Sequence, residues 1–238
     1  LRHLLGVSPD AAAEVLDRLG PLQAQGGGPR SRLGLAEACL ALKRFPEALQ
    51  HLESVITSNP EMSAEFLHAT GLLIGLAPDL APRLVALLTT LEPRSPLPVA
   101  VHFARGEAQF QAGQLQASAA SFREVLQSAP DRVQEVRAAL EKFDRADPRA
   151  AEARYLLASI YLDQRDHEAA IRELNRPGPT HAALLAQVLR KYDEILAESP
   201  QDLAARAGLM QALLLARQFD RALEIGRDTL KICDDETT

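Results

Sequence analysis

The chain has 238 residues and a formal net charge of −6, with 47% hydrophobic residues, 4% aromatic residues and no tryptophan. This apolar content is sufficient for a sizeable core, which excludes a disordered chain. Because Lys and Arg are interleaved with Asp and Glu, the charge pattern argues against nucleic-acid binding. Alanine and leucine dominate while runs of β-branched and aromatic residues are missing, and this predicts an all-α protein.

The first predicted element is a lone helix at about residues 9–24. Ser8 is suited to cap its N-terminus, and Pro9 is suited to the first helical position. The GGGP sequence at 26–29 ends this helix and allows a new segment to start. We therefore assign residues 1–28 to a lone N-terminal helix followed by a glycine-rich link.

A helix–turn–helix pattern then recurs along the chain. Residues 31–56 and 205–230 align so that Gly34 falls on Gly208 and Phe45 falls on Phe219. Each segment reads as a helix, a short polar turn and a second helix. An early small residue in the second helix lets the paired helix come close. The two segments are therefore copies of one structural unit.

This unit resembles the tetratricopeptide repeat, in which two helices pack through a small residue in each and a proline closes a unit of about 34 residues. The small residue of the first helix falls at Ala36, Ala69, Gly106 and Ala158, with Met210 in the last copy. That of the second helix falls at Ala48, Ala81, Ser118, Ala170 and Ala222. A large apolar residue follows four places later at Leu52, Val85, Phe122 and Leu174, but Gly226 breaks the pattern. Closing prolines stand at Pro60, Pro93 and Pro130.

The spacing lengthens in the C-terminal half of the chain. The small residue of the second helix recurs after 52 residues from Ser118 to Ala170, and again after 52 residues to Ala222. Each interval leaves room for an extra helix, and the stretches 131–148 and 183–200 both carry apolar residues on one helical face.

We therefore expect a single domain spanning residues 1–238. It comprises three regular helix pairs at 29–130, two three-helix units at 131–233 and a polar tail at 234–238. The resemblance covers about residues 29–233, and it implies a right-handed α-solenoid of stacked antiparallel helix pairs.

The resemblance also implies a concave groove, lined by the first helix of each pair, that binds a partner protein or peptide. Carried over residue by residue, the groove candidates are Leu33, Glu37, Phe66, Thr70, Phe103, Glu107, Tyr155, Ser159 and Gln211. Family members that hold acidic chaperone tails use Asn, Lys and Arg on these helices, whereas this chain has Glu, Thr, Ser and Gln. We therefore expect a groove of negative potential and a neutral or basic partner.

Each candidate also has an alternative interpretation. The three rings, Phe66, Phe103 and Tyr155, would then fill gaps between adjacent helices. Glu37 and Glu107 would then be solvated charges without a role, because a carboxylate is rarely buried without a partner.

No catalytic, metal or cofactor motif stands out. The six histidines have no metal-ligand spacing, and we expect His68 and His102 to be packing or groove residues. The GGGPRS run lacks the Lys-Ser/Thr ending of a phosphate loop. Cys39 and Cys233 suggest neither a disulfide nor a metal cluster. We therefore predict a protein that is not an enzyme, with no cofactor and no bound metal.

The longest uncharged run, residues 66–78, is about half of the roughly 20 residues that a membrane span needs. We predict no membrane span and a soluble protein. The cytoplasm is favoured unless a targeting segment precedes this sequence. The last helix carries Leu223 and Leu230 with no polar capping helix after it, so we expect that this end can self-associate.

The favoured function is a protein–protein interaction scaffold or adaptor that binds its partner in the groove. One alternative is a regulatory or substrate-docking domain of a larger enzyme whose catalytic part lies outside this chain. Another is a purely structural role, in which the stack assembles into oligomers and the groove stays empty.

Overall fold

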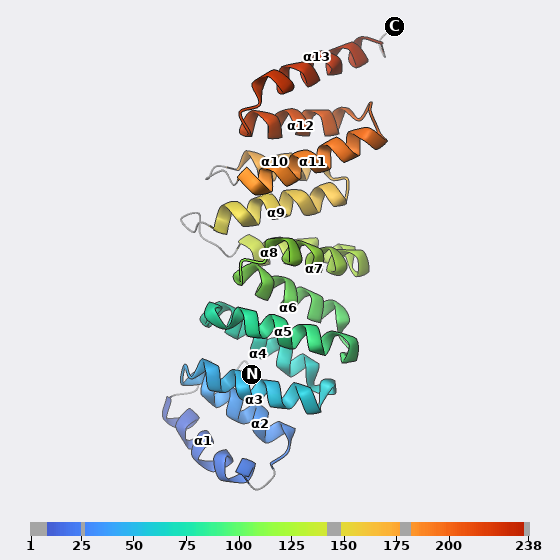
Figure 1. Ribbon diagram of the computed structural model, residues 1–238. Helices are drawn as coiled ribbons and strands as arrows, with labels where there is room; N and C mark the ends of the chain where they lie inside the picture. Colours follow the sequence, from blue (N-terminus) through green and yellow to red (C-terminus); the bar gives the residue numbers. More distant parts are fainter. Residues whose placement is uncertain (1–8, 25–26, 142–148, 177–181, 236–238) are drawn as a thin grey trace. The chain divides into compact units, whose positions relative to one another are not determined.

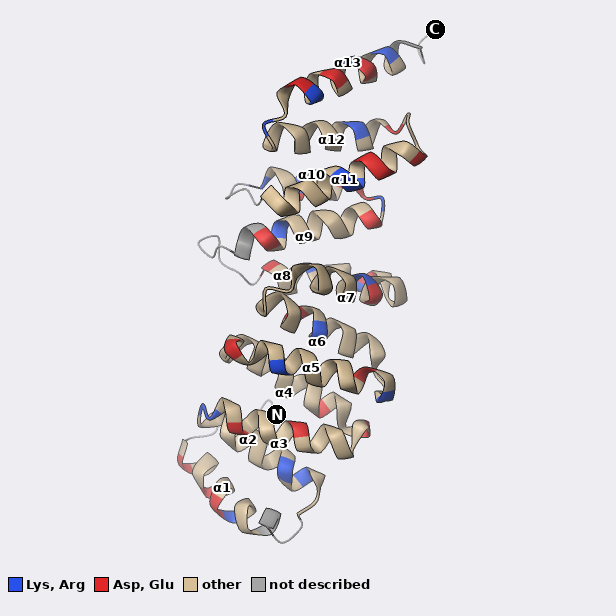
Figure 2. Cartoon of the chain, in the orientation of Figure 1, with Lys and Arg blue, Asp and Glu red and all other residues tan. Residues whose placement is uncertain are grey.

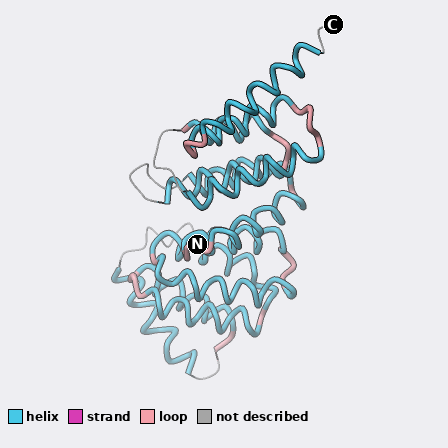
Figure 3. Tube along the Cα trace, turned by 45° about the horizontal axis from the view of Figure 1, so that its top comes forward, coloured by secondary structure: helices cyan, strands magenta, loops and turns pink. Residues whose placement is uncertain are grey.

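The computed structural model describes residues 9–24, 27–141, 149–176 and 182–235. Within these ranges every regular element is a helix, and turns connect the helices (Figure 3). The predicted all-α fold of helix pairs is confirmed. Ser8, the predicted cap of the first helix, lies outside the described residues, as does most of the predicted polar tail.

The chain divides into two compact units, residues 1–130 and 131–238. The helices of the first unit, from blue to green in Figure 1, are α1 (Pro9–Ala24), α2 (Pro29–Ala41), α3 (Phe45–Ser58), α4 (Ser63–Leu76), α5 (Ala81–Leu91), α6 (Pro98–Gln111) and α7 (Leu115–Ser128). Short 3-10 turns join them at η2 (Pro60–Met62), η3 (Pro78–Leu80) and η4 (Glu92–Arg94).

The second unit begins within the turn η5 (Pro130–Arg132). Its helices are α8 (Val133–Glu141), α9 (Arg149–Asp163), α10 (His167–Asn175), α11 (Ala182–Glu198), α12 (Leu203–Leu215) and α13 (Phe219–Asp235). Both stretches with the longer spacing contain a helix, α8 in the first and α11 in the second. Helix α8 packs on α9, whereas α11 packs on both α9 and α12. In the first unit α1 packs on α2 in a similar way. The predicted domain boundaries themselves remain a prediction.

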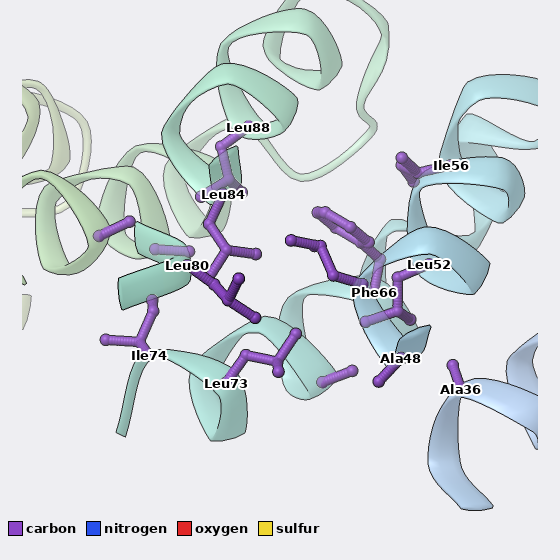
Figure 4. Close-up of a cluster of buried hydrophobic side chains, with 14 of the residues drawn as sticks. Ala36, Ala48, Leu52, Ile56, Phe66, Leu73, Ile74, Leu80, Leu84 and Leu88 are labelled. Carbon is purple, nitrogen blue, oxygen red and sulfur yellow. The ribbon is translucent and has the colours of Figure 1, made fainter. Parts of the chain in front are cut away.

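The core of the first unit is apolar and continuous through its helix pairs. Figure 4 shows Phe66 of α4 between side chains of α3, including Leu52, and side chains of α5, including Leu84. These three residues are fully buried. Each such side chain contributes about 1.5–3 kcal/mol relative to an exposed one. In α5 Leu84 is fully buried, whereas the next residue, Val85, which the repeat pattern predicts to be the large buried one, is only half-buried.

Four of the five helix pairs turn from their first to their second helix in the same way. One residue adopts a left-handed conformation, with φ between 57° and 72°, and the next backbone N–H donates to a carbonyl five residues back. The left-handed residues are Lys43, Gly113, Arg165 and Arg217. The bonds from Arg44, Gln114, Asp166 and Gln218 measure 2.8–2.9 Å. This motif satisfies carbonyls that the end of a helix leaves unpaired.

The second pair, α4 and α5, turns differently. Helix α4 runs to Leu76, and Pro78 keeps the preceding Ala77 out of the helical region, at φ −141° and ψ 70°. The 3-10 turn η3 then stands where the first turn of α5 would be. The early small residue, Ala81, is still fully buried. The proline therefore changes the turn but keeps the close-packed position.

Helices α6 and α7 pack through a small residue facing a large one. A methyl group at Gly106 would lie 2.9 Å from the ring of Phe122, which is fully buried. In the last pair the sizes are reversed, because a methyl group at Gly226 would lie 3.3 Å from Cε of Met210. Met210 and Gly226, two exceptions to the repeat pattern, therefore compensate each other.

Candidate partner-binding face

The structure separates the nine predicted groove residues into two groups. Four are buried, with 6% exposure or less: Phe66 and Thr70 in the first unit, and Tyr155 and Ser159 in the second. The other five are half-buried: Leu33, Glu37, Phe103 and Glu107 in the first unit, and Gln211 in the second. Only these five present side-chain surface to a partner. The four buried residues instead pack between helices within their own units.

Two of the buried residues, Thr70 and Tyr155, have identified local contacts. The hydroxyl of Thr70 donates to the carbonyl of Phe66 at 2.9 Å, one helical turn back, so this polar group is satisfied inside the core. The guanidinium carbon of Arg154 lies 4.9 Å from the centre of the Tyr155 ring. Tyr155, Tyr161 and Tyr192 are all buried in the second unit.

Phe103 differs from Phe66 and Tyr155 because it is only half-buried. It packs edge to face on Phe122, with 5.8 Å between ring centres and 72° between ring planes. Helix α6, which carries it, contacts both α4 and α5. Phe103 is therefore held in place by its own unit while it offers an apolar surface.

Glu37 lies one helical turn beyond Leu33 on α2, and Glu107 lies one turn beyond Phe103 on α6. Burial raises the pKa of Glu37 above its ordinary value of 4.5, and the proximity of His68 on α4 opposes part of this effect. A half-buried carboxylate of this kind favours a cationic group that would replace its lost hydration. The helix faces of the first unit thus combine apolar and acidic groups.

A basic residue on three of the first helices contacts a residue further along the chain. Arg32 of α2 donates to Ser54 of α3 at 2.9 Å, and His102 of α6 lies 3.5 Å from a carboxylate oxygen of Glu124. In the second unit Arg154 donates to the backbone carbonyl of Arg176. We call this recurring contact the basic clasp; in each case it joins residues 22 positions apart. The clasp thus engages Arg32 and Arg154 in hydrogen bonds within their own units.

A larger polar cluster lies where η4, α6 and α7 meet. The Arg105 guanidinium binds Glu92, and it also binds Glu124 at 2.6 Å and Ser121 at 3.0 Å. His102 bonds with Glu92 at 2.7 Å. The single arginine offsets one of the two carboxylate charges. It ties these three elements together.

The ligand atoms of Glu92, His102 and Glu124 lie within 4.8 Å of one another, a spacing that could hold a metal ion. Arg105, however, already occupies an oxygen of each carboxylate, and its fixed positive charge would repel a cation. We therefore assign this cluster a structural role.

Sequence reasoning missed both the basic clasp and this cluster. A signal for the clasp is present in the alignment: Arg32, His102 and Arg154 each stand four residues before the small position of the first helix. The cluster has no such signal, because Glu92 and Arg105 are not part of the repeat pattern.

Comparison with known sequences agrees with this architecture. The sequence model of the family described as "Tetratricopeptide repeat" matches residues 8–63, 85–133 and 133–179, more than half of the chain. The chain therefore belongs to the tetratricopeptide repeat family, as the sequence predicts. No curated protein matches the chain in sequence.

Membership in this family supports a general role in protein–protein interaction. Proteins of the family are typically non-catalytic scaffolds. Among the described residues, none of the helices combines the length and apolar character that crossing a bilayer requires.

Proposed function

We propose that the chain is a scaffold or adaptor that binds a basic or neutral peptide on the first helices of its first unit. The binding face comprises Leu33 and Glu37 of α2 with Phe103 and Glu107 of α6. Helix α4 lies between them in the packing order, since it contacts both α2 and α6. Gln211 of α12 would provide a separate contact in the second unit.

The observation that supports this proposal most directly is the division of charge. Arg32 donates to Ser54 of α3, and His102 bonds with Glu92 of η4. The half-buried carboxylate of Glu37 has a raised pKa. An extended or helical segment with apolar side chains and Lys or Arg would cover the Phe103 ring and pair with the acidic groups.

The test is to pan a random 12-residue peptide library against the chain. We expect enriched peptides to be basic or neutral, with apolar anchors, and to bind less tightly as salt increases. Phe103→Ala should weaken their binding by about tenfold or more, because aromatic anchors dominate such contacts. Asp79→Asn, an exposed carboxylate in η3, serves as the control and should leave binding unchanged. Enrichment of acidic peptides, or of none, would contradict the proposal.

Glu37→Gln gives a sharper distinction between binding and stability. Because the folded-state pKa is raised, the folded chain holds more protons than the unfolded chain just above pH 4.5, so stability falls as pH rises through that window. At pH 7 the charged form is disfavoured by burial, and the Gln variant should be at least as stable. It should nevertheless bind a selected basic peptide less tightly. Equal affinity in both proteins would remove Glu37 from the binding face.

The same face would serve the alternative function, a docking domain within a larger enzyme. In that case the selected peptides should resemble a substrate segment of that enzyme. They should also change the turnover rate of the full-length enzyme, while the isolated chain should bind them without catalysing any reaction.

A further inference from the structure

A row of apolar side chains on α13 is open to solvent in the second unit. Phe219, Leu223 and Leu230 are 57%, 60% and 66% exposed, respectively. Their spacing of four and seven residues places them on one side of the helix. Ala222, which is 3% exposed, and Gly226, which lies against Met210, mark the side that packs on α12. Gly226 also borders this row. We call the row, which comprises Phe219, Leu223, Gly226 and Leu230, the α13 seam.

The corresponding positions are covered elsewhere in the chain. In the repeat alignment Leu223 matches Leu49 and Leu230 matches Ile56, both on α3. These two residues are 0% and 4% exposed in the core of the first unit, where α3 contacts α4 and α5. This side of a second helix is therefore a stacking surface that another helix normally covers.

We propose that the α13 seam is covered by α13 of a second copy of this chain, with the two helices antiparallel about a twofold axis. In this register Leu223 lies opposite Gly226 of the partner copy, so a large side chain meets a small one. Phe219 lies opposite Leu230 of the partner copy. A twofold contact of this kind is self-complementary, because each residue is used once from each side.

The charges beside the seam select this arrangement. Asp220 and Arg227 each follow a seam residue by one position, on the side away from α12. In an antiparallel helix pair these flanking positions face each other, so Asp220 pairs with Arg227 of the partner copy, and the twofold axis repeats the pair. Neither residue has an ion-pair partner among the described residues, and Figure 2 shows both signs of charge along α13. In a parallel pair Asp220 and Arg227 would instead lie opposite Ala222 or Thr229 of the partner copy, and these residues are uncharged.

The dimer should be weak. A 17-residue helix is about 25 Å long, and two such helices bury less than the roughly 1,600 Å² of a standard stable interface. We therefore expect monomer–dimer exchange at micromolar concentrations.

The first test is sedimentation velocity of the chain from about 1 to 500 μM, which brackets a micromolar dissociation constant. We expect a dimer to form within this range. Leu223→Asp combined with Leu230→Asp should leave only monomer, whereas Leu76→Asp, at an apolar residue of α4 that is 51% exposed, should dimerise normally. Circular dichroism checks that each variant is folded. A monomer throughout the range would overturn the proposal and indicate that a different protein or segment covers the seam.

The second test examines the antiparallel register of the two helices without changing the apolar residues of the α13 seam. Asp220→Arg and Arg227→Asp each make all four flanking charges of a dimer alike, so each variant alone should dimerise at least about tenfold more weakly. An equimolar mixture of the two should form a heterodimer with affinity near that of the unaltered chain. Unchanged dimerisation of the single variants, or failure of the mixture to recover, would exclude the antiparallel register.

Discussion

Two helix pairs of this chain make the same contact with the sizes of the two residues exchanged. In α6 and α7 a glycine on the first helix, Gly106, receives the ring of Phe122 from the second. In α12 and α13 the first helix supplies Met210, and the second supplies Gly226. Either helix of a pair can therefore supply the small residue of this contact, provided that the other helix supplies the large one.

The two pairs also differ in where the first helix carries its glycine. Helix α12 has Gly208, two residues before Met210, and two residues correspond to about 200° around a helix. Gly208 therefore faces nearly the opposite way, and it lies against Tyr192 of α11. The matching residue of α6 is Ala104. The additional helix α11 accounts for this difference, since its tyrosine needs space in α12.

The largest effect is expected for Gly208→Ala, because a methyl group there would overlap the phenol of Tyr192. Tyr192 is fully buried, so its ring has little freedom to move aside. We expect a loss of about 3 kcal/mol in the free energy of unfolding. Hydrogen exchange of the α11 and α12 amides is the suitable measurement, since repeat arrays open in parts. Tyr192→Leu in the same chain should recover part of the loss, and the absence of any recovery would count against this contact.

Gly106→Ala should cost about 2 kcal/mol, because its methyl group would press on the buried Phe122 ring. The flat ring can shift slightly, which makes the loss smaller than at Gly208. Denaturant unfolding, followed by hydrogen exchange in α6 and α7, measures it. Phe122→Leu alone should lower the free energy of unfolding because it removes ring contacts. Its effect should be smaller in a chain that already carries Gly106→Ala. Strictly additive effects would show that the two residues do not share one packing site.

The turns of the two pairs should respond in opposite directions. Gly113 adopts φ 72° at the turn of the first pair, and Arg217 adopts φ 57° at the same place in the second. Gly113→Ala should destabilise by about 1 kcal/mol, whereas Arg217→Gly should stabilise by up to about 1 kcal/mol, because only glycine adopts this conformation without steric cost. Thermal unfolding of the two variants gives the comparison. A loss in both would mean that the Arg217 side chain has a role of its own.

The smallest effect is expected for Gly226→Ala. The nearest atom is the terminal Cε of Met210, 3.3 Å away, and a methionine side chain adapts easily. Alanine also favours the helix over glycine, so we expect a net gain of about 0.5 kcal/mol in stability. Chemical unfolding of the Gly226→Ala and Gly106→Ala variants under the same conditions completes the comparison. A loss as large as that at Gly106 would show that Met210 is as confined as Phe122.

Much of this fold is predictable from the sequence, because helix pairs have a strong local pattern. The close-packed residues, such as Ala48 and Ala222, are buried where the repeat places them. The exchange between Met210 and Gly226 was not predictable, since the pattern shows only two separate exceptions. Their contact depends on distances between helices, which no local pattern encodes.

The candidate binding face is less predictable than the fold. Phe66 and Phe103 occupy equivalent positions in the repeat, yet one is fully buried and the other is half-buried. The difference arises beyond the repeat itself, because Phe66 lies in the core between α3 and α5, in the pair with the altered turn. A repeat alignment assigns a position to each residue, but only the packed neighbours determine its exposure.

The placement of the tyrosines makes the second unit optically distinct. The chain has three tyrosines and no tryptophan, and all three tyrosines are buried beyond residue 130. Tyrosine fluorescence of the unmodified chain will therefore follow the melting of the second unit alone, while far-ultraviolet circular dichroism follows both. Coincident curves from the two signals would mean that the units unfold as one cooperative system, and separated curves would give each unit its own transition without any added label.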